Sequence, residues 1–276
     1  MRKTNVLVTL LIICALWRIC HSQQTAQCRS LPGEFKARRF DDIAHRQTIQ
    51  KIHNRIRTLR NKSSWNVYYK DVGSYIASHY QLSNRNNPDA KLDTTIEIVE
   101  IGTAFGGAAN SLLSHIKSAT VSAIDPFMAG YDVEDAQSGK YVEIANEANV
   151  DIKMLSTVWA EAMHHELRGK YSCRYHLYHM TSDDAVQYFA HKDGKPIIDV
   201  IFIDGLHTYE GIKRDIEAWV PLVKSGGLVM FSDYSDIWAN SVVKAINEYV
   251  NATGVTLVQG RRNIPPGLGN AVFVKP

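Results

Sequence analysis

Long hydrophobic runs are scarce in this sequence. Its N-terminal apolar run, Val6–Trp17, has twelve residues and ends at Arg18, whereas a membrane-spanning helix needs about 20. Arg2 and Lys3 precede the run and small residues follow it, which is the three-part pattern of a signal peptide. The sequence therefore predicts a signal peptide over residues 1–22 and no stable membrane span. An uncleaved, signal-anchored form is the alternative.

Net charge is also lacking. The whole chain has 31 basic and 28 acidic side chains, and three of the basic ones lie in the predicted signal peptide. The remaining 28 basic residues balance 28 acidic ones, so neither a nucleic acid nor an anionic membrane is indicated as a partner.

Cysteine is rare, because only four occur in the chain. Cys14 and Cys20 would leave with the signal peptide, so Cys28 and Cys173 remain. In an oxidising compartment we expect these two to form a disulfide that ties the N-terminal arm to the domain; two unrelated thiols are the alternative. Asn61 and Asn251 begin N-x-[ST] sequons, which are typical of a secreted or lumenal glycoprotein.

Internal repeats are absent, and strands alternate with helices over most of the chain. Residues 23–94 form an N-terminal arm and helical extension, with an exposed helix over 38–60 and a second helix over 65–80. Within 95–276, apolar runs predict strands at 95–102, 119–125, 173–180, 197–204, 226–233, 255–260 and 270–276. This alternation predicts an α/β fold with a doubly wound, mostly parallel, seven-stranded Rossmann-like sheet.

The G-x-G-x-x-G pattern of dinucleotide-binding proteins is missing from the first strand-to-helix turn. The turn instead follows E-x-G-x-x-x-G, with Glu100, Gly102 and Gly106. Asp125 ends the second strand, where a carboxylate accepts hydrogen bonds from the ribose hydroxyls of a nucleoside. The pattern favours a nucleoside-containing ligand; a tight turn without a ligand is the alternative.

Acids and a histidine follow two later strands. The stretch "IDVIFIDGLHTYEG" turns from a buried strand into Asp204 and His207, and the next strand ends at Ser232 and Asp233. Ligands of doubly wound sheets bind outside the carboxyl ends of the strands. These residues are therefore candidates for a second part of the same site.

The segments "VEIGTAFGG", "SAID" and "DVIFIDGLHTYEGIKRDIEAWVPLVKSGGLVMFSDY" resemble class I S-adenosylmethionine (SAM)-dependent methyltransferases, and family 24 in particular. The resemblance covers about residues 95 to 275. It implies that SAM is the cofactor and that the protein is an O-methyltransferase acting on a small-molecule or sugar hydroxyl. The cofactor-binding residues that it implies are Glu100, Gly102, Gly106, Asp125, Ser182, Asp183 and Asp204.

The same resemblance implies a second cofactor. Asp204 and Asp233 would bind Mg²⁺ or another divalent cation, and His207 would serve as general base beside Asp204. Ser232 stands where similar enzymes carry a further acid, which leaves the metal open.

Other residues are interpreted as structural. Asp215 and Glu217 are expected on a solvated helix face, and His164 and His165 on the surface. The loop 126–139 is a candidate lid, and the helices of the extension are candidates for a homo-oligomer contact.

Two other functions remain open from the sequence. A secreted binding or structural protein would keep the methyltransferase fold without catalysis, since SAM is made in the cytosol. A nicotinamide oxidoreductase fits the alternation but not the glycine turn.

Overall fold

A computed structural model describes residues 28, 30–37, 43–61, 63–80, 95–128, 136–190, 195–235, 241–259 and 270–276. The predicted signal peptide lies outside the described residues. No helix among the described segments is both long and apolar enough to cross a lipid bilayer.

A seven-stranded sheet in the order β3-β2-β1-β4-β5-β7-β6 forms the centre of the described chain. Strands β1 to β5 pair in parallel, and β7 runs antiparallel to both β5 and β6. Six of the strands have four or more residues, and β6 has two. The bounds are β1 Ile96–Ile101, β2 Ala119–Ile124, β3 Tyr175–Tyr178, β4 Ile198–Ile203, β5 Val223–Phe231, β6 Val258–Gln259 and β7 Ala271–Val274.

The sheet is buried on both faces, which explains the apolar runs of its strands. All six residues of β4 are buried. Phe202 belongs to the apolar cluster on one face, and its neighbours Ile201 and Ile203 belong to the cluster on the other. The predicted doubly wound, mostly parallel α/β sheet is confirmed.

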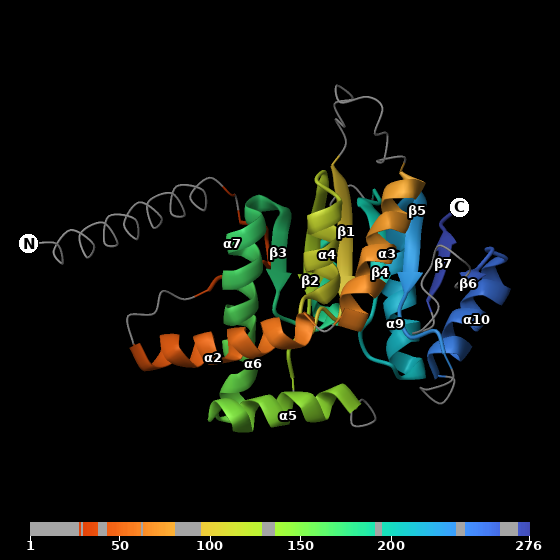
Figure 1. The fold of residues 1–276 in the computed structure, drawn as a ribbon. Helices are drawn as coiled ribbons and strands as arrows, with labels where there is room; N and C mark the ends of the chain where they lie inside the picture. Colours follow the sequence, from red (N-terminus) through yellow and green to blue (C-terminus); the bar gives the residue numbers. More distant parts are fainter. Residues whose placement is uncertain are drawn as a thin grey trace, which may run out of the picture.

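Helices cover both faces of this sheet (Figure 1). Residues of α2 to α6 contribute to one apolar cluster, and residues of α8 to α10 contribute to the other. The bounds are α2 Ile43–Arg60, α3 Ser63–His79, α4 Gly107–His115, α5 Ala136–Ala148, α6 Ile152–Met163, α7 Gly169–Tyr171, α8 Ser182–Ala185, α9 Tyr209–Trp219 and α10 Ser241–Thr253.

Short irregular helical turns link several of these elements. A π-helical turn, His164–Arg168, connects α6 to α7. Three 3₁₀ turns occur at Ser172–Arg174, Val186–Tyr188 and Val220–Leu222.

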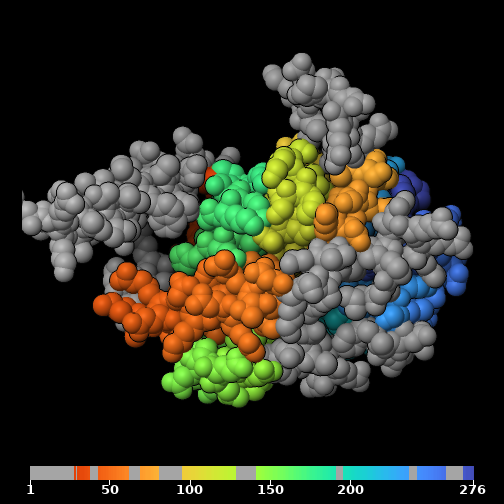
Figure 2. Space-filling view, in the orientation of Figure 1, coloured from red at the N-terminus to blue at the C-terminus, as the bar shows by residue number. Residues whose placement is uncertain are grey.

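The helical extension packs on the domain more closely than the sequence indicates. The prediction of an exposed helix over 38–60 is wrong, because α2 buries four apolar residues and one arginine: Ile49, Ile52, Ile56, Leu59 and Arg60. The high charge of the helix hid an apolar stripe at helical spacing. Figure 2 shows α2 and α5 forming one continuous surface.

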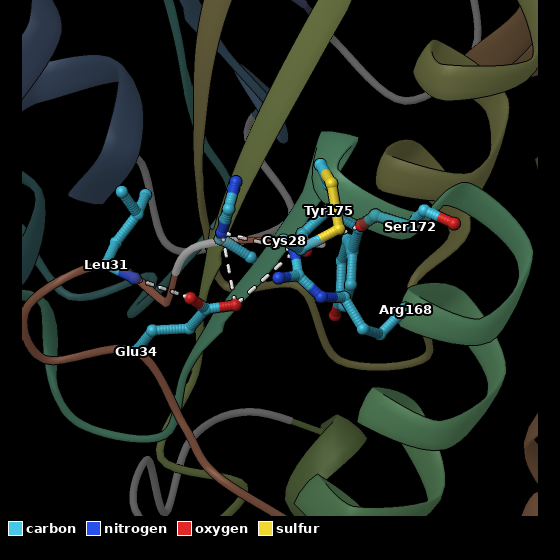
Figure 3. Close-up of a disulfide and its surroundings, with 8 residues drawn as sticks. Cys28, Leu31, Glu34, Arg168, Ser172 and Tyr175 are labelled. Carbon is cyan, nitrogen blue, oxygen red and sulfur yellow. Dashed lines mark hydrogen bonds and ion pairs between the residues drawn. A yellow bond between two sulfur atoms is a disulfide. The ribbon is translucent and has the colours of Figure 1, made fainter. Parts of the chain in front are cut away.

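The arm before α2 is tied to the edge strand β3. A disulfide joins Cys28 to Cys173, so the predicted pairing is confirmed. Glu34 is buried beside it and lies 3.5 Å from Arg168 Nη1, and the Leu31 N–H donates to its carboxylate (Figure 3). The Phe35 N–H donates to the Leu177 carbonyl at 2.6 Å. The arm therefore covers part of an edge that would otherwise offer unpaired backbone groups.

Candidate active site

The carboxyl ends of β1 and β4 meet at Gly102. The residue has a φ of +81°, and a Cβ there would lie 2.0 Å from the Asp204 carbonyl oxygen. Only glycine allows this combination of left-handed backbone and close approach. The two strands lie at the point where the strand order reverses, which is where such sheets bind ligands.

The turn after β1 is held in a strained conformation. Ala104 has a φ of +41°, and its N–H donates to Asp125 Oδ2 at 2.7 Å. The Phe127 N–H donates to the other carboxylate oxygen of Asp125 at 2.6 Å. A carboxylate oxygen accepts more than one hydrogen bond, so Asp125 keeps acceptor capacity for a further donor.

The acids of this region are unusually buried. Glu100 is 1% exposed and accepts a hydrogen bond from the Thr103 hydroxyl at 2.9 Å. Burial raises the pKa of Glu100 to about 8 and the pKa of Asp125 to about 6, although hydrogen bonds oppose both shifts. Carboxyl groups with a shifted pKa at the ends of strands are typical of functional sites.

A second group of titratable residues lies beside this turn. One ligand atom each of Asp204, His207 and Asp233 lie within 4.8 Å of one another. His207 Nε2 lies 3.2 Å from Asp233 Oδ2. Burial and repulsion from Asp233 raise the pKa of Asp204 well above its usual range, and His207 opposes this shift. The structure thus brings together the three residues that the sequence predicts for catalysis and metal binding.

The donor set of this cluster suits a divalent cation. The carboxylates of Asp204 and Asp233 are ligands that such ions accept, and water completes their coordination. A cation would also relieve the repulsion between the two carboxylates. The Ser232 hydroxyl lies 3.3 Å from Asp233 Oδ2, so the position without an acid still carries an oxygen next to the cluster.

Residues 99–234 match a family model described as a methyltransferase domain, the family 24 model. This chain carries a family 24 methyltransferase domain. The matched segment includes every predicted site residue from Glu100 to Asp233, and the predicted family is confirmed.

An uncharacterized protein of Acanthamoeba polyphaga mimivirus is 28% identical to this methyltransferase over 171 residues. The match covers 61% of this chain and 65% of the viral protein, so the chain spans slightly less than two thirds of that relative.

Solved structures with a similar fold are more distant in sequence. An O-methyltransferase from Bacillus cereus in complex with SAH is 13% identical, with a TM-score of 0.46 over 81% of this chain and 90% of that one. A putative caffeoyl-CoA O-methyltransferase from Staphylococcus aureus is 16% identical, with a TM-score of 0.45 over 85% and 100%.

The expected adenine-side residues take other partners. The Ser182 hydroxyl donates to Asp215 Oδ1 at 2.5 Å, and Asp183 is an exposed residue 3.5 Å from Arg214 Nε. Ser182 is the first residue of α8, whose N-cap is Thr181. A role for Ser182 and Asp183 at the adenine stays a prediction.

Two structural interpretations from the sequence are wrong. Asp215 does not lie on a solvated face, because it is 3% exposed, and burial raises its pKa to about 7. His164 is half-buried rather than on the surface, and burial lowers its pKa to about 4. Residues 129–135 of the predicted lid lie outside the described residues.

Two further residues contact the glycine turn, and neither was predicted from the sequence. Trp159 and Arg60 donate to consecutive carbonyls of the turn, at Ala104 and Phe105. Arg60 gave no signal, because it is one basic residue among several on a charged helix.

Proposed function

We propose that this methyltransferase transfers a methyl group from SAM to a hydroxyl oxygen of a small molecule or sugar. The observation that carries the proposal is the Asp204–His207–Asp233 cluster beside the glycine turn, within a methyltransferase domain. A base next to a cofactor turn is the arrangement that proton removal and methyl transfer need.

The turn and the end of β2 fit the cofactor. Asp125 would accept hydrogen bonds from the ribose hydroxyls, and Glu100, Gly102 and Gly106 would border the methionine portion. The space that a Cβ would take at either glycine is filled by the protein itself. The two glycines therefore act by shaping the turn, which lets its backbone lie close to a ligand.

The cluster would position and deprotonate the acceptor. SAM supplies the activated methyl group, and a divalent cation held by Asp204 and Asp233 would act as a Lewis acid toward the acceptor. The imidazole of His207 would accept the hydroxyl proton, because a neutral imidazole nitrogen is a proton acceptor. Asp233, 3.2 Å from Nε2, favours the imidazolium that results.

Formation of S-adenosylhomocysteine, the demethylated cofactor, tests this proposal. Purified protein is incubated with SAM, Mg²⁺ and a panel of catechols and sugars, and S-adenosylhomocysteine is measured. We expect His207→Ala to lower kcat by roughly 10²- to 10⁴-fold. His79→Ala is the matched control, because His79 contacts the Gly226 carbonyl in the amino-terminal half of β5, away from the carboxyl ends of the strands.

A binding or structural role without catalysis is the competing function. It predicts no product with any acceptor and equal behaviour of the wild type and His207→Ala. The intact cluster of two acids and a histidine favours the enzyme.

We also propose that the protein is a glycoprotein of the secretory pathway or of the extracellular space. A disulfide is typical of oxidising compartments, and Asn61 and Asn251 are both exposed. Treatment of the secreted protein with an N-glycosidase is expected to lower its apparent mass. Asn61→Gln and Asn251→Gln assign the change to each site, and an unchanged mass contradicts the proposal.

A further inference from the structure

The turn between β1 and α4 adopts a backbone that its sequence does not favour. Ala104, at a φ of +41°, is in the left-handed region, which costs a residue with a Cβ about 1–2 kcal/mol. Such a conformation persists only where the surroundings enforce it, and it occurs most often at functional sites. The contacts that hold Ala104 therefore show what keeps the turn in shape.

Three side chains from three different elements hold this turn. Asp125 of the β2 end accepts from the Ala104 N–H, as described above. Trp159 Nε1 of α6 donates to the Ala104 carbonyl at 3.0 Å. Arg60 Nε of α2 donates to the next carbonyl, that of Phe105, at 2.6 Å. Both consecutive peptide groups are thus fixed from outside the turn.

Burying the guanidinium of Arg60 for such a contact costs desolvation free energy. Its side chain is 3% exposed, and a buried guanidinium needs partners for its remaining donors. Nη1 lies 2.6 Å from Glu166 Oε1, and Nη2 donates to Met163 Sδ at 3.5 Å. Glu166 belongs to the π-helical turn and also lies 3.1 Å from His53 Nε2.

The position of Arg60 links the helical extension to the cofactor region. A Cβ added at Gly106, the last residue before α4, would lie 3.3 Å from Arg60 Nη2. The positive charge also favours the ionised form of the buried Glu100. An exposed or uncharged donor could also hold the Phe105 carbonyl. It would neither lie next to Gly106 nor favour the ionised form of Glu100.

We propose that Arg60 is a positioning residue for SAM: it fixes the Phe105 carbonyl and thereby keeps the turn 102–107 in its binding-competent shape. This inference rests on the proposed function. It makes α2, which lies outside the segment matched by the family model, a part of the cofactor site.

Calorimetric titration of SAM into full-length variants tests the affinity part. We expect Arg60→Met to weaken SAM binding by roughly ten- to a hundredfold, the effect of losing one charge-assisted hydrogen bond. Arg60→Lys keeps the charge but not the planar guanidinium that contacts both the Phe105 carbonyl and Glu166. We therefore expect a smaller loss of SAM affinity than in Arg60→Met. Arg168→Met is the control, because Arg168 also donates to backbone carbonyls, those of Ser172 and Tyr175, but next to the edge strand β3.

The thermal stability of each variant separates positioning from folding. The double variant Arg60→Met/Glu166→Gln avoids leaving Glu166 without its cation. We expect it to unfold cooperatively near the wild-type temperature and still bind SAM weakly. Equal SAM affinity in the wild type and in these variants would overturn the proposal.

Hydrogen exchange without any ligand separates this inference from the proposed function. We expect the amides of residues 103–108 to exchange faster in Arg60→Met than in the wild type, and to be unchanged in Arg168→Met. Unchanged exchange in Arg60→Met overturns the inference whether or not the wild type binds SAM. A wild type that binds no SAM overturns the proposed function and the affinity claim together.

Discussion

At the scale of single residues, Gly102 fixes how closely the two strands of the site approach. We predict that Gly102→Ala lowers the free energy of unfolding by about 3 kcal/mol or more, because left-handed strain adds to a backbone clash with Asp204. Gly226→Ala is the control: its φ is +79°, but nothing lies within 4 Å of the added Cβ. Urea unfolding of both variants measures the difference, and equal losses would contradict this account.

Asp215 predicts a dependence of stability on pH. Burial raises its pKa from 3.8 to about 7, so the native state keeps a proton that the unfolded state releases near pH 4. The contribution of Asp215 to stability is therefore full below pH 4 and is lost as the pH rises toward 7.

Asp215→Asn should remove this dependence. We predict that the variant gains roughly 1–4 kcal/mol over the wild type at pH 8, and less at pH 4.5. Urea unfolding at the two pH values measures the gain. The exposed neighbour Glu217 supplies the control, because Glu217→Gln should give no pH-dependent difference. A gain from Asp215→Asn that is the same at both pH values would count against the burial argument.

The roles of single residues could be predicted where the neighbouring sequence indicates their position in the fold. Asp204 and His207 follow an apolar strand directly, so their place at the strand end is visible in the sequence. Asp215 and Arg60 lie on helices among other charged residues. Their burial depends on which helix face meets a distant element, and the sequence does not show that contact.

At the scale of elements, the arm at residues 28–37 depends on its disulfide. Cys28 and Cys173 are separated by 145 positions, and closing so long a loop restricts the unfolded chain strongly. We predict that Cys28→Ser/Cys173→Ser lowers the free energy of unfolding by about 2–4 kcal/mol. Denaturant unfolding measures it, and reduced wild-type protein should behave like the variant. An unchanged free energy would show that the arm is held by Glu34 and Phe35 alone.

Strands were easier to predict than helix ends. The strands β1, β2 and β4 are almost fully buried, and most of their residues are apolar. Helix ends rest on single side-chain contacts, such as the Thr181 hydroxyl that accepts from the Asp184 N–H. The π-helical turn at His164–Arg168 has no marker in the sequence. Its Glu166 and Arg168 pair with Arg60 of α2 and Glu34 of the arm, and the sequence does not show these contacts.

At the scale of the whole molecule, the extension and the domain share one apolar cluster. Ile52 and Ile56 of α2 belong to the same cluster as Val121 and Phe202 of the sheet. The alternation of strands and helices predicted the sheet, but the predicted boundary at residue 95 does not mark an independent core.

We therefore predict that residues 95–276 alone lack a stable fold. Loss of α2 and α3 exposes buried apolar side chains to water. Each Å² of apolar surface exposed in this way lowers the free energy of unfolding by about 25 cal/mol. Calorimetric scanning should show no cooperative transition for the fragment and one for residues 23–276. A fragment that unfolds as cooperatively as the longer chain would contradict the shared core.

The central claim is that SAM binds at the carboxyl ends of β1, β2 and β4. Calorimetric titration of SAM into residues 23–276, with and without Mg²⁺, tests it most directly. The account predicts micromolar binding to the wild type and its loss in Asp125→Ala, whose carboxylate holds the turn and would accept from the ribose. No binding to the wild type in either buffer would contradict the account and leave a protein that keeps the methyltransferase fold for another purpose.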